Sequence, residues 1–419
     1  MTTFAIRFLI IVFILIALDL YAYQAFRTIF RIKSMPWIYW GITLLVFAWL
    51  VYAMFNFANG SVRNSARFSY LFGIMILLYV PKMLVAFTMA VEDVYRIGFA
   101  LWKAVLTLLP TSEANAQDVV FLPSRRSFIS QTGILLAALP FVSILYGITR
   151  GKYDFRVRRQ VLHFDNLPDS FEGFTITQIS DLHSGSFDNR GKLEYAVDLI
   201  NEQASDVILF TGDLVNNHSD EMEPWVELFE KLKAPYGKFS ILGNHDYGDY
   251  VQWNSPEEKR GNFENLLDVH RRLGFSLLRN EHVTLQKEDG KIHIAGVENW
   301  GLPPFPQYGD LNKALQGLGP KDPIVLMSHD PSHFDAEVRQ HPAQVELTLS
   351  GHTHGMQFGI EVPGFRWSPV KYRYPKWAGL YSEGKNNLYV NRGFGVLAFP
   401  GRVGIWPEIT VIELRKAQA

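Results

Sequence analysis

Five long apolar segments within the first 150 residues constrain the fold of this chain more than any other feature. They cover residues 4–23, 38–57, 68–89, 94–109 and 128–148. About 20 apolar residues in a helix are enough to cross the hydrocarbon core of a bilayer. The alternative is a set of buried helices in a large soluble protein, but such helices normally keep a polar face and these segments have none. The sequence therefore predicts four or five transmembrane helices within residues 1–149.

One charged residue interrupts the third apolar segment. Lys82 follows Pro81, and Glu92 and Asp93 come just after the segment. A charge inside a membrane-spanning helix can mark a functional site. We favour a simpler interpretation, in which the helix is kinked at the proline and the lysine extends its amine toward the membrane surface.

Two signals disagree about the orientation of these helices. Arg125-Arg126-Ser127-Phe128 resembles a twin-arginine export signal and, if it stays in the cytoplasm, places the following domain outside. Basic residues after the first and fifth segments favour a cytoplasmic domain by the positive-inside rule. These residues are Arg27, Arg31, Lys33, Arg150, Lys152, Arg156, Arg158 and Arg159. We expect a protein of the bacterial cell membrane, and the favoured orientation places its second domain outside the cytoplasm.

Residues 150–419 have a different composition and predict a second domain, with strand structure from about Val161. Charged residues are frequent, and short β-like apolar runs alternate with helical stretches, as in residues 174–179, 193–203 and 206–210. This alternation is typical of an α/β domain. The 419-residue chain has a net charge of −1 and no cysteine. Disulfides, thiolate metal sites and a cysteine nucleophile are therefore excluded, and nothing marks the chain as a nucleic-acid binder.

Five of the predicted strands end in a short cluster of Asp, Asn or His residues. The clusters are Asp181-Leu182-His183, Gly212-Asp213, Gly243-Asn244-His245-Asp246, Ser328-His329-Asp330 and His352-Thr353-His354. Taken singly, a cluster has an ordinary explanation as a helix cap or a turn. Ligands of open α/β sheets gather beyond the carboxyl ends of the strands, so the five clusters are expected to meet in space. Together they hold five of the twelve histidines and predict a metal centre.

The candidate ligands are Asp181, His183, Asp213, Asn244, His329, His352 and His354. Oxygen and imidazole nitrogen suit manganese, iron, zinc or cobalt. Seven ligands are too many for one tetrahedral ion and suit two ions that share a carboxylate. Two ions about 3.5–4 Å apart serve phosphoryl chemistry, because they lower the pKa of a shared water and bind phosphate oxygens. Such a pocket would be net positive and would favour an anionic phosphate ester.

Taken in order, the five clusters resemble the motifs of the calcineurin-like metallophosphoesterases, over residues 174–413. The resemblance implies a four-layer α/β/β/α sandwich with two metal ions at the strand ends. By position, Asp181, His183 and His354 would hold the first ion, Asn244, His329 and His352 the second, and Asp213 would bridge the two. The resemblance also implies that His245 contacts the phosphate and protonates the leaving oxygen as a general acid, and that Asp246 orients His245.

Within the family, the chain is most similar to membrane-associated bacterial phosphodiesterases, some of which carry a twin-arginine segment. Those proteins tend to read Gly-His-Thr-His-Gly-Gly-Gln, whereas this chain has Met356 at the second of the two adjacent glycines, a change that could reshape the pocket floor. Some relatives cleave the pyrophosphate of UDP-diacylglucosamine in lipid A synthesis. The resemblance thus implies hydrolysis of a phosphodiester or pyrophosphate bond, with a lipid-linked substrate as one candidate. This chain has several predicted membrane helices, whereas a single anchor is expected for such relatives. Their substrate therefore cannot be transferred directly to this chain.

Two features near the C-terminus each have alternative interpretations. Arg392, in Tyr389-Val390-Asn391-Arg392-Gly393, could bind a substrate phosphate bidentately or bond to neighbouring carbonyls. The aromatic residues from Trp367 to Tyr381 could form a pocket wall for a lipid or nucleoside or contact the membrane interface, with core packing as the default.

These observations lead us to expect a membrane-anchored dimetal phosphoesterase whose partners are the bilayer and a phosphoester substrate, with no nucleic acid. The alternatives are a membrane sensor or transporter that binds metal and phosphate without turnover, a scaffold, and a nuclease. His245 argues against a binding-only protein, and the complete ligand set argues against a scaffold. The neutral charge and the membrane anchor argue against a nuclease.

Overall fold

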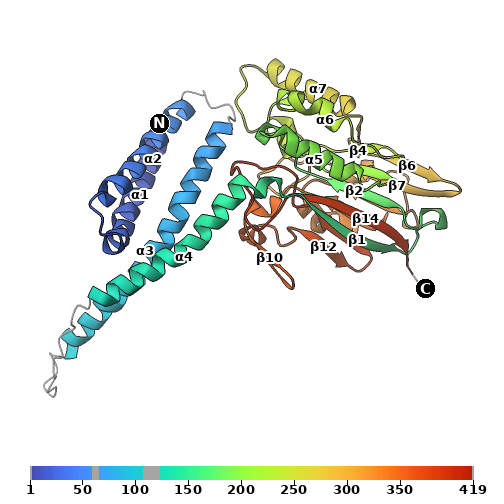
Figure 1. Ribbon diagram of the computed structural model, residues 1–419. Coiled ribbons are helices and arrows are strands. Elements are labelled where there is room, and N and C mark those ends of the chain that lie inside the picture. The colour runs from blue at the N-terminus through green and yellow to red at the C-terminus, as the bar shows by residue number, and fades with distance from the viewer. Residues whose placement is uncertain (1, 59–65, 107–122, 418–419) are drawn as a thin grey trace. The chain divides into compact units, whose positions relative to one another are not determined.

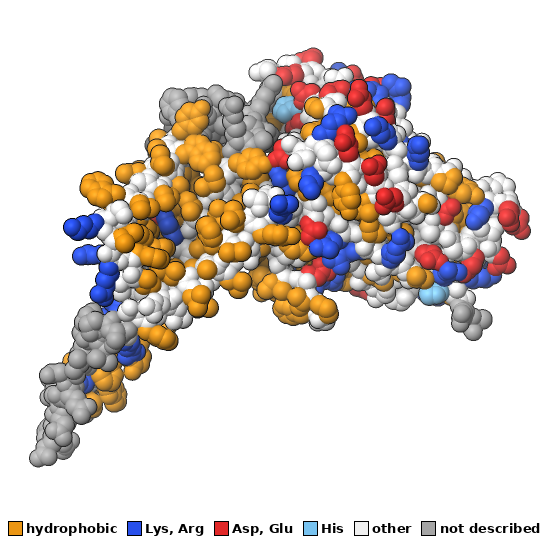
Figure 2. Space-filling model, in the orientation of Figure 1, with side chains coloured by type: hydrophobic (Ala, Val, Ile, Leu, Met, Phe, Trp, Pro, Cys, Tyr) orange, Lys and Arg blue, Asp and Glu red, His pale blue; other side chains and the backbone are white. Residues whose placement is uncertain are grey.

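The computed structural model describes residues 2–58, 66–106 and 123–417. The chain divides into two compact units, one formed by Met1–Val62 and Leu71–Leu145 and the other by Arg63–Tyr70 and Tyr146–Ala419. Apolar side chains cover the helices of the first unit, whereas acidic and basic side chains are spread over the second (Figure 2). The first unit therefore has a lipid-facing surface, and the second has a surface suited to water.

Four long helices, shown in Figure 1, account for the first unit. They are α1 (Thr2–Ile29), α2 (Met35–Ala58), α3 (Ala66–Leu106) and α4 (Pro123–Thr149). Each is long and apolar enough to cross a membrane, so the structure has the lower of the two predicted helix numbers. The third and fourth apolar segments form one helix, because Glu92 and Asp93 between them do not interrupt it. Residues 107–109 of the predicted fourth segment lie outside the described residues.

Lys82 does not extend to the membrane surface, so that prediction is wrong. The residue is 9% exposed, and its Nζ lies 2.5 Å from Oδ1 of the fully buried Asp19. The hydroxyls of Tyr39, Thr43 and Tyr79 also donate hydrogen bonds to the Asp19 carboxylate. A charge among apolar helices is stable only when it is paired, and Asp19 on α1 supplies the partner that keeps the lysine inside the bundle.

Two six-stranded sheets form the core of the second unit. Their strand orders are β1-β14-β2-β3-β4-β5 and β12-β13-β9-β8-β7-β6, and β10 pairs with β11 in a separate hairpin. The bounds are β1 (Arg156–Phe164), β2 (Thr175–Ile179), β3 (Val207–Phe210), β4 (Lys238–Ser240), β5 (Ser276–Leu277), β6 (Glu281–Lys287), β7 (Gly290–Gly296), β8 (Ile324–Met327), β9 (Leu347–Ser350), β10 (Ile360–Val362), β11 (Phe365–Trp367), β12 (Gly379–Glu383), β13 (Asn386–Val390) and β14 (Glu408–Lys416).

Alternate residues of the central strands face opposite layers. In β3, Val207 and Leu209 belong to the apolar core between the two sheets. Ile208 and Phe210 point the other way and share an apolar cluster with α5 (Arg190–Asn201), α6 (Val226–Phe229) and α7 (Pro256–Arg272). The outward residues of β8 pack in the same manner with α8 (Leu311–Ala314) and α9 (Ser332–Ala336). These layers make the α/β/β/α sandwich that the family resemblance implies.

The first strand of the sandwich begins earlier than the sequence indicates. β1 starts at Arg156 rather than near Val161, and it pairs in parallel with β14. Three of the basic residues that favour a cytoplasmic domain by the positive-inside rule therefore belong to a strand. They are Arg156, Arg158 and Arg159. Nη2 of Arg158 lies 2.7 Å from the carboxylate of Glu361, so this charge has a partner within the domain.

Candidate metal centre

Parallel strands bring the predicted ligands together at one edge of each sheet. β2, β3 and β4 are parallel neighbours, as are β8 and β9. The predicted ligands follow the carboxyl ends of these five strands and form two groups whose ligand atoms all lie within 4.8 Å of one another. These groups are Asp181, His183 and His354, and Asp213, His329 and His352. Asn244, the seventh predicted ligand, lies beside the second group, because its Oδ1 is 2.8 Å from Nδ1 of His352. Each group could hold one metal ion.

Nitrogen and oxygen atoms converge within the two groups. The Nε2 atoms of His183 and His354 are 3.0 Å apart, and Nε2 of His354 lies 3.2 Å from Oδ1 of Asp181. Oδ2 of Asp213 lies 3.1 Å from Nε2 of His329 and 3.5 Å from Nε2 of His183. The Asp213 carboxylate therefore reaches imidazoles of both groups, as a bridging ligand would. This donor set fits two divalent cations.

Hydrogen bonds on the outer side of two imidazoles leave Nε2 directed at the centre. Nδ1 of His329 lies 2.7 Å from the carbonyl oxygen of Thr211, and Nδ1 of His183 lies 3.1 Å from Oδ1 of Asn216. Both contacts place the Nδ1 proton on the outer side of the ring, so Nε2 is the nitrogen that faces the metal position, as in many metal sites. The buried Nε2 of His329 has no hydrogen-bond partner among the described residues; the Asp213 oxygen, although near, does not meet hydrogen-bond geometry. A cation would satisfy this buried nitrogen.

His352 presents its other nitrogen to the centre. While Nδ1 faces Asn244, Nε2 lies 2.8 Å from the hydroxyl of Tyr374 and 3.6 Å from a carboxylate oxygen of Asp330. These two residues hold the ring in place. Sequence reasoning missed both, although Asp330 stands in the same strand-end cluster as His329. The roles of Tyr374 and Asn216 have no comparable signal, since neither is adjacent in sequence to a predicted ligand.

The backbone at five of the seven predicted ligands is left-handed. Asp181, His183, Asp213, His352 and His354 have φ values between 47° and 69°. This conformation costs about 1–2 kcal/mol for a residue with a side chain, so the strand ends bend at an energetic cost to aim these groups. Strain of this kind clusters at functional sites.

His245 lies beside the first group, but Asp246 does not orient it as predicted. The ring centroids of His245 and His183 are 4.9 Å apart, and Nδ1 of His245 lies 2.7 Å from the carbonyl oxygen of Asn216. The carboxylate of Asp246 instead accepts hydrogen bonds from the backbone N–H groups of Asp213, Leu214, Val215 and Gly243. Buried N–H groups require acceptors, so Asp246 stabilises the turn after β3, and the Asn216 carbonyl orients the His245 ring.

Burial and a carboxylate set the charges of the imidazoles. Burial holds the pKa of His183 and of His352 below the ordinary value, so both are neutral at neutral pH, as metal ligands must be. Burial alone would also lower the pKa of His329, but the neighbouring carboxylate of Asp213 outweighs it and raises the pKa to about 10. A metal ion that binds His329 must therefore displace a proton.

A pocket of about 430 Å³ opens onto the two groups, and Tyr250, Phe305, Arg373, Tyr374 and Leu397 contribute to its wall. The stretch 367–381 thus supplies two pocket residues, Arg373 and Tyr374, whereas Trp377 packs in a small apolar cluster with Ala378 and Ile405.

Two predicted pocket residues are not part of this wall. Arg392 is 2% exposed, and its guanidinium is bonded to the carboxylates of Glu361 and Glu408. Its partners are nearby side chains, so the structure does not place it where it could bind a substrate phosphate. Met356 is 59% exposed and does not line the pocket, so the expected effect on the pocket floor is wrong.

Comparison with known proteins extends over both units. The family model for the calcineurin-like phosphoesterases matches residues 174–356, and the model for the "Probable Calcineurin-like phosphoesterase, transmembrane domain" matches residues 5–152. The uncharacterized metallophosphoesterase YkuE of Bacillus subtilis is 32% identical over 298 residues, which cover 70% of this chain and 98% of the relative. This chain belongs to the calcineurin-like metallophosphoesterase family.

Further relatives of this metallophosphoesterase come from other bacteria. An uncharacterized metallophosphoesterase of Helicobacter pylori is 27% identical over 391 residues, covering 88% of this chain and 96% of the relative. The UDP-2,3-diacylglucosamine pyrophosphatase LpxG of Chlamydia trachomatis is 30% identical over 277 residues, covering 55% of this chain and 81% of LpxG. A solved dimetal phosphatase from Danio rerio is similar at a TM-score of 0.32 and 13% identity, covering 53% of this chain and 88% of that chain. The chain is a metal-dependent phosphoester hydrolase and an integral membrane protein.

Proposed function

We propose that this metallophosphoesterase hydrolyses a phosphodiester or pyrophosphate bond of a lipid-linked substrate. The observation that carries the proposal is the position of the Asp213 carboxylate, which lies within 3.5 Å of imidazole nitrogens from both groups. A carboxylate shared by two groups suits a pair of ions, and paired ions stabilise both the attacking and the leaving oxygen of an in-line displacement at phosphorus. The membrane unit, the aromatic pocket wall and the similarity to LpxG support a lipid-linked substrate.

In this proposal, Asp181, His183 and His354 would hold one ion, and Asn244, His329 and His352 would hold the other. Asp213 would contribute to both. The chain's remaining residues orient the site. The amide of Asn244 donates to the hydroxyl of Tyr250 over 2.9 Å, which leaves its Oδ1 directed toward His352 and the second group. Arg392 is not included, because its guanidinium is occupied.

His245 is the proposed general acid. Its Nδ1 contacts the Asn216 carbonyl, a group that can only accept, so Nδ1 carries a proton and Nε2 is the atom that can transfer one. The carbonyl also stabilises the doubly protonated ring. His245 lies in the pocket wall, where Nε2 can reach the leaving oxygen of a substrate bound between the two groups.

We also propose that the catalytic domain lies outside the cytoplasm. With four spans, the loop after α1 and the start of α4 are on the membrane side opposite to residue 150 and beyond. That side carries Arg27, Arg31, Lys33, Arg125 and Arg126, which the positive-inside rule assigns to the cytoplasm. A cytoplasmic catalytic domain would require five spans for the same basic residues, and three of the arginines that favour it belong to strand β1.

Purified full-length protein in detergent, stripped of metal and reloaded with manganese, provides the test. Wild type, His245→Ala and Asp213→Ala are compared on bis-p-nitrophenyl phosphate and then on lipid phosphodiesters and lipid pyrophosphates. We expect metal-dependent hydrolysis that both variants lose, and a preference for the lipid substrates over water-soluble diesters.

Two results would change this conclusion. Preference for soluble diesters would remove the lipid-linked substrate but keep the hydrolase. Two bound metal ions without turnover of any phosphoester would favour the membrane sensor or transporter instead.

A further inference from the structure

We propose that the four-helix unit binds an anionic phospholipid, with the phosphate at a group of arginines and one acyl chain in a cavity between the helices. This inference concerns a site within the first unit and is independent of the substrate proposed above. Three observations support it. An apolar cavity lies between the helices, and a basic groove lies near it at the C-terminal end of α1. The charge in the cavity wall is paired within the protein, whereas two arginines of the groove have no carboxylate partner among the described residues.

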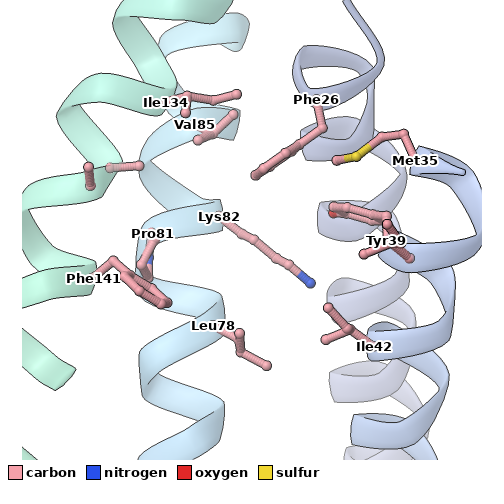
Figure 3. A pocket seen from close by; sticks show the side chains of 13 residues that line it. Phe26, Met35, Tyr39, Ile42, Leu78, Pro81, Lys82, Val85, Ile134 and Phe141 are labelled. Carbon is pink, nitrogen blue, oxygen red and sulfur yellow. The ribbon is translucent and has the colours of Figure 1, made fainter. Parts of the chain in front are cut away.

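The cavity lies among residues of all four helices and has a volume of about 440 Å³. Phe26 and Met35 line its end near the α1–α2 turn, and Leu78 and Phe141 line the other end (Figure 3). Two lining residues of α2, Ile38 and Ile42, are 50% and 46% exposed, so the cavity is accessible from the side of the bundle. In a membrane-spanning segment this side faces lipid. An acyl chain of a neighbouring lipid can therefore enter the cavity directly from the bilayer.

Among the described residues that line the cavity, Lys82 alone is charged, and its charge is neutralised internally. Its side chain extends from α3 toward Tyr39 on α2 (Figure 3), and its amine pairs with Asp19. Asp19 is fully buried and accepts hydrogen bonds from three hydroxyls besides. The wall therefore presents no net charge to an occupant. A neutral, apolar part of an amphiphile suits it, whereas a free anionic head group does not.

A basic groove lies at the C-terminal end of α1, beside the start of α4. It is lined by Gln24, Arg27, Thr28, Arg31 and Arg126. The guanidinium of Arg126 donates to Gln24 and pairs with Asp93 at 3.3 Å. Arg27 and Arg31 are exposed, and among the described residues neither has a carboxylate partner. Their uncompensated charge favours a phosphate, and basic pockets between membrane helices commonly bind phospholipid head groups.

The depths of the two features match the length of a lipid. Asp93 and Arg126 mark a polar level on α3 and α4. Lys82 is eleven residues before Asp93 on α3, which corresponds to about 17 Å at 1.5 Å per residue. This depth is near the middle of a hydrocarbon core about 30 Å thick. A phosphate at the arginines would thus place an acyl chain beside Phe26 and Met35 and along the Lys82 level.

The test measures lipid binding to the full chain in detergent by native mass spectrometry. The probes are phosphatidylglycerol and phosphatidylcholine with identical acyl chains. We expect phosphatidylglycerol to bind at least tenfold more tightly. Arg27→Gln/Arg31→Gln should weaken the binding of phosphatidylglycerol by about 30-fold, because the phosphate loses two charge-assisted contacts in the groove. Lys33→Gln, which removes a charge outside the groove, is the matched control and should bind as wild type.

A second pair of variants tests the cavity. Ala138 lines it and is exposed, so Ala138→Trp fills the cavity without crowding the bundle core. This variant should lose tight binding of phosphatidylglycerol, whereas Leu139→Trp, at an exposed neighbour that does not line the cavity, should keep it. Equal binding of the two lipids to wild type, or an unchanged arginine variant, would overturn the head-group site. Unchanged binding by Ala138→Trp would overturn the acyl-chain site.

Discussion

Each unit of this protein contains a buried cluster of charged and polar residues, and the two clusters differ in their internal contacts. In the membrane unit, the carboxylate of Asp19 meets the amine of Lys82 and three hydroxyl donors. In the catalytic domain, His183 and His354 turn nitrogens toward each other at 3.0 Å, and Nε2 of His329 lacks a hydrogen-bond partner among the described residues. The first cluster is satisfied by the protein alone, whereas the second leaves a buried nitrogen of His329 without a partner among the described residues. Burial of polar groups therefore does not identify a metal site, whereas the convergence of ligand atoms around a buried nitrogen without a partner indicates one.

The largest expected effect is a loss of activity when the imidazole of His183 is removed from the catalytic domain's cluster. His183→Ala should lower kcat/KM on a phosphodiester by at least about 1,000-fold, because two-ion stabilisation of the transition state supplies several kcal/mol. The bound metal per chain, measured by mass spectrometry, should fall from two ions toward one. His163→Ala, an exposed histidine outside both groups, is the control. Near-wild-type activity with a single bound ion would show that the cluster in the catalytic domain does not need two ions for hydrolysis.

The membrane cluster should respond in stability rather than in activity. Asp19→Leu leaves the Lys82 charge buried without a partner and should reduce the free energy of unfolding by about 3–5 kcal/mol. Asp19→Leu/Lys82→Met removes both charges and should recover most of this loss. Thermal unfolding in detergent measures both variants, and hydrolysis per folded molecule should stay unchanged. If the single and double variants are equally stable, the pair does not hold α1 and α3 together.

A smaller effect is expected from the residue that holds His352. Tyr374→Phe removes the hydroxyl 2.8 Å from Nε2 of His352 and should lower metal affinity or activity by about 10–100-fold, the usual range for residues behind a metal ligand. Tyr372→Phe, at a side chain that is 77% exposed, is the matched control. Equal behaviour of the two variants would show that the Tyr374 hydroxyl does not orient the ring.

The remaining effect concerns the pH dependence of metal binding. The Asp213 carboxylate raises the pKa of His329 to about 10 in the metal-free protein, and metal binding requires the neutral ring. Metal affinity should therefore rise by up to about tenfold per pH unit as the pH approaches 10. Calorimetry with manganese at pH 6.5, 7.5 and 8.5 tests this, and a flat profile would show that His329 is already neutral.

The raised pKa of His329 has the opposite consequence for the stability of the metal-free protein, which should fall as the pH rises. Because the folded pKa of His329 is raised, its protonation contributes stability that is fully present below about pH 6.5, the unfolded value. That contribution is lost as the pH rises toward 10. Higher pH should thus weaken the apo-protein and strengthen metal binding.

The sequence alone determined the class of each unit and the identity of the candidate ligands. The apolar segments indicated membrane helices, and the clusters after buried strands indicated seven ligands that parallel pairing does bring together. Both are local signals: hydropathy depends on a segment's own residues, and a ligand that follows a buried strand lies at the sheet edge wherever that strand pairs.

The partner of each buried group, by contrast, depends on contacts between segments that are distant in sequence. The separation of Lys82 from Asp19 along the chain hides their pairing, and Glu361 and Glu408 occupy Arg392 from other elements. In the same way, Asn216 rather than the adjacent Asp246 contacts His245, and Tyr374 contacts His352. Hydrogen bonds and ion pairs depend on positions within about 3–4 Å, and chain folding, not sequence distance, sets which groups come that close.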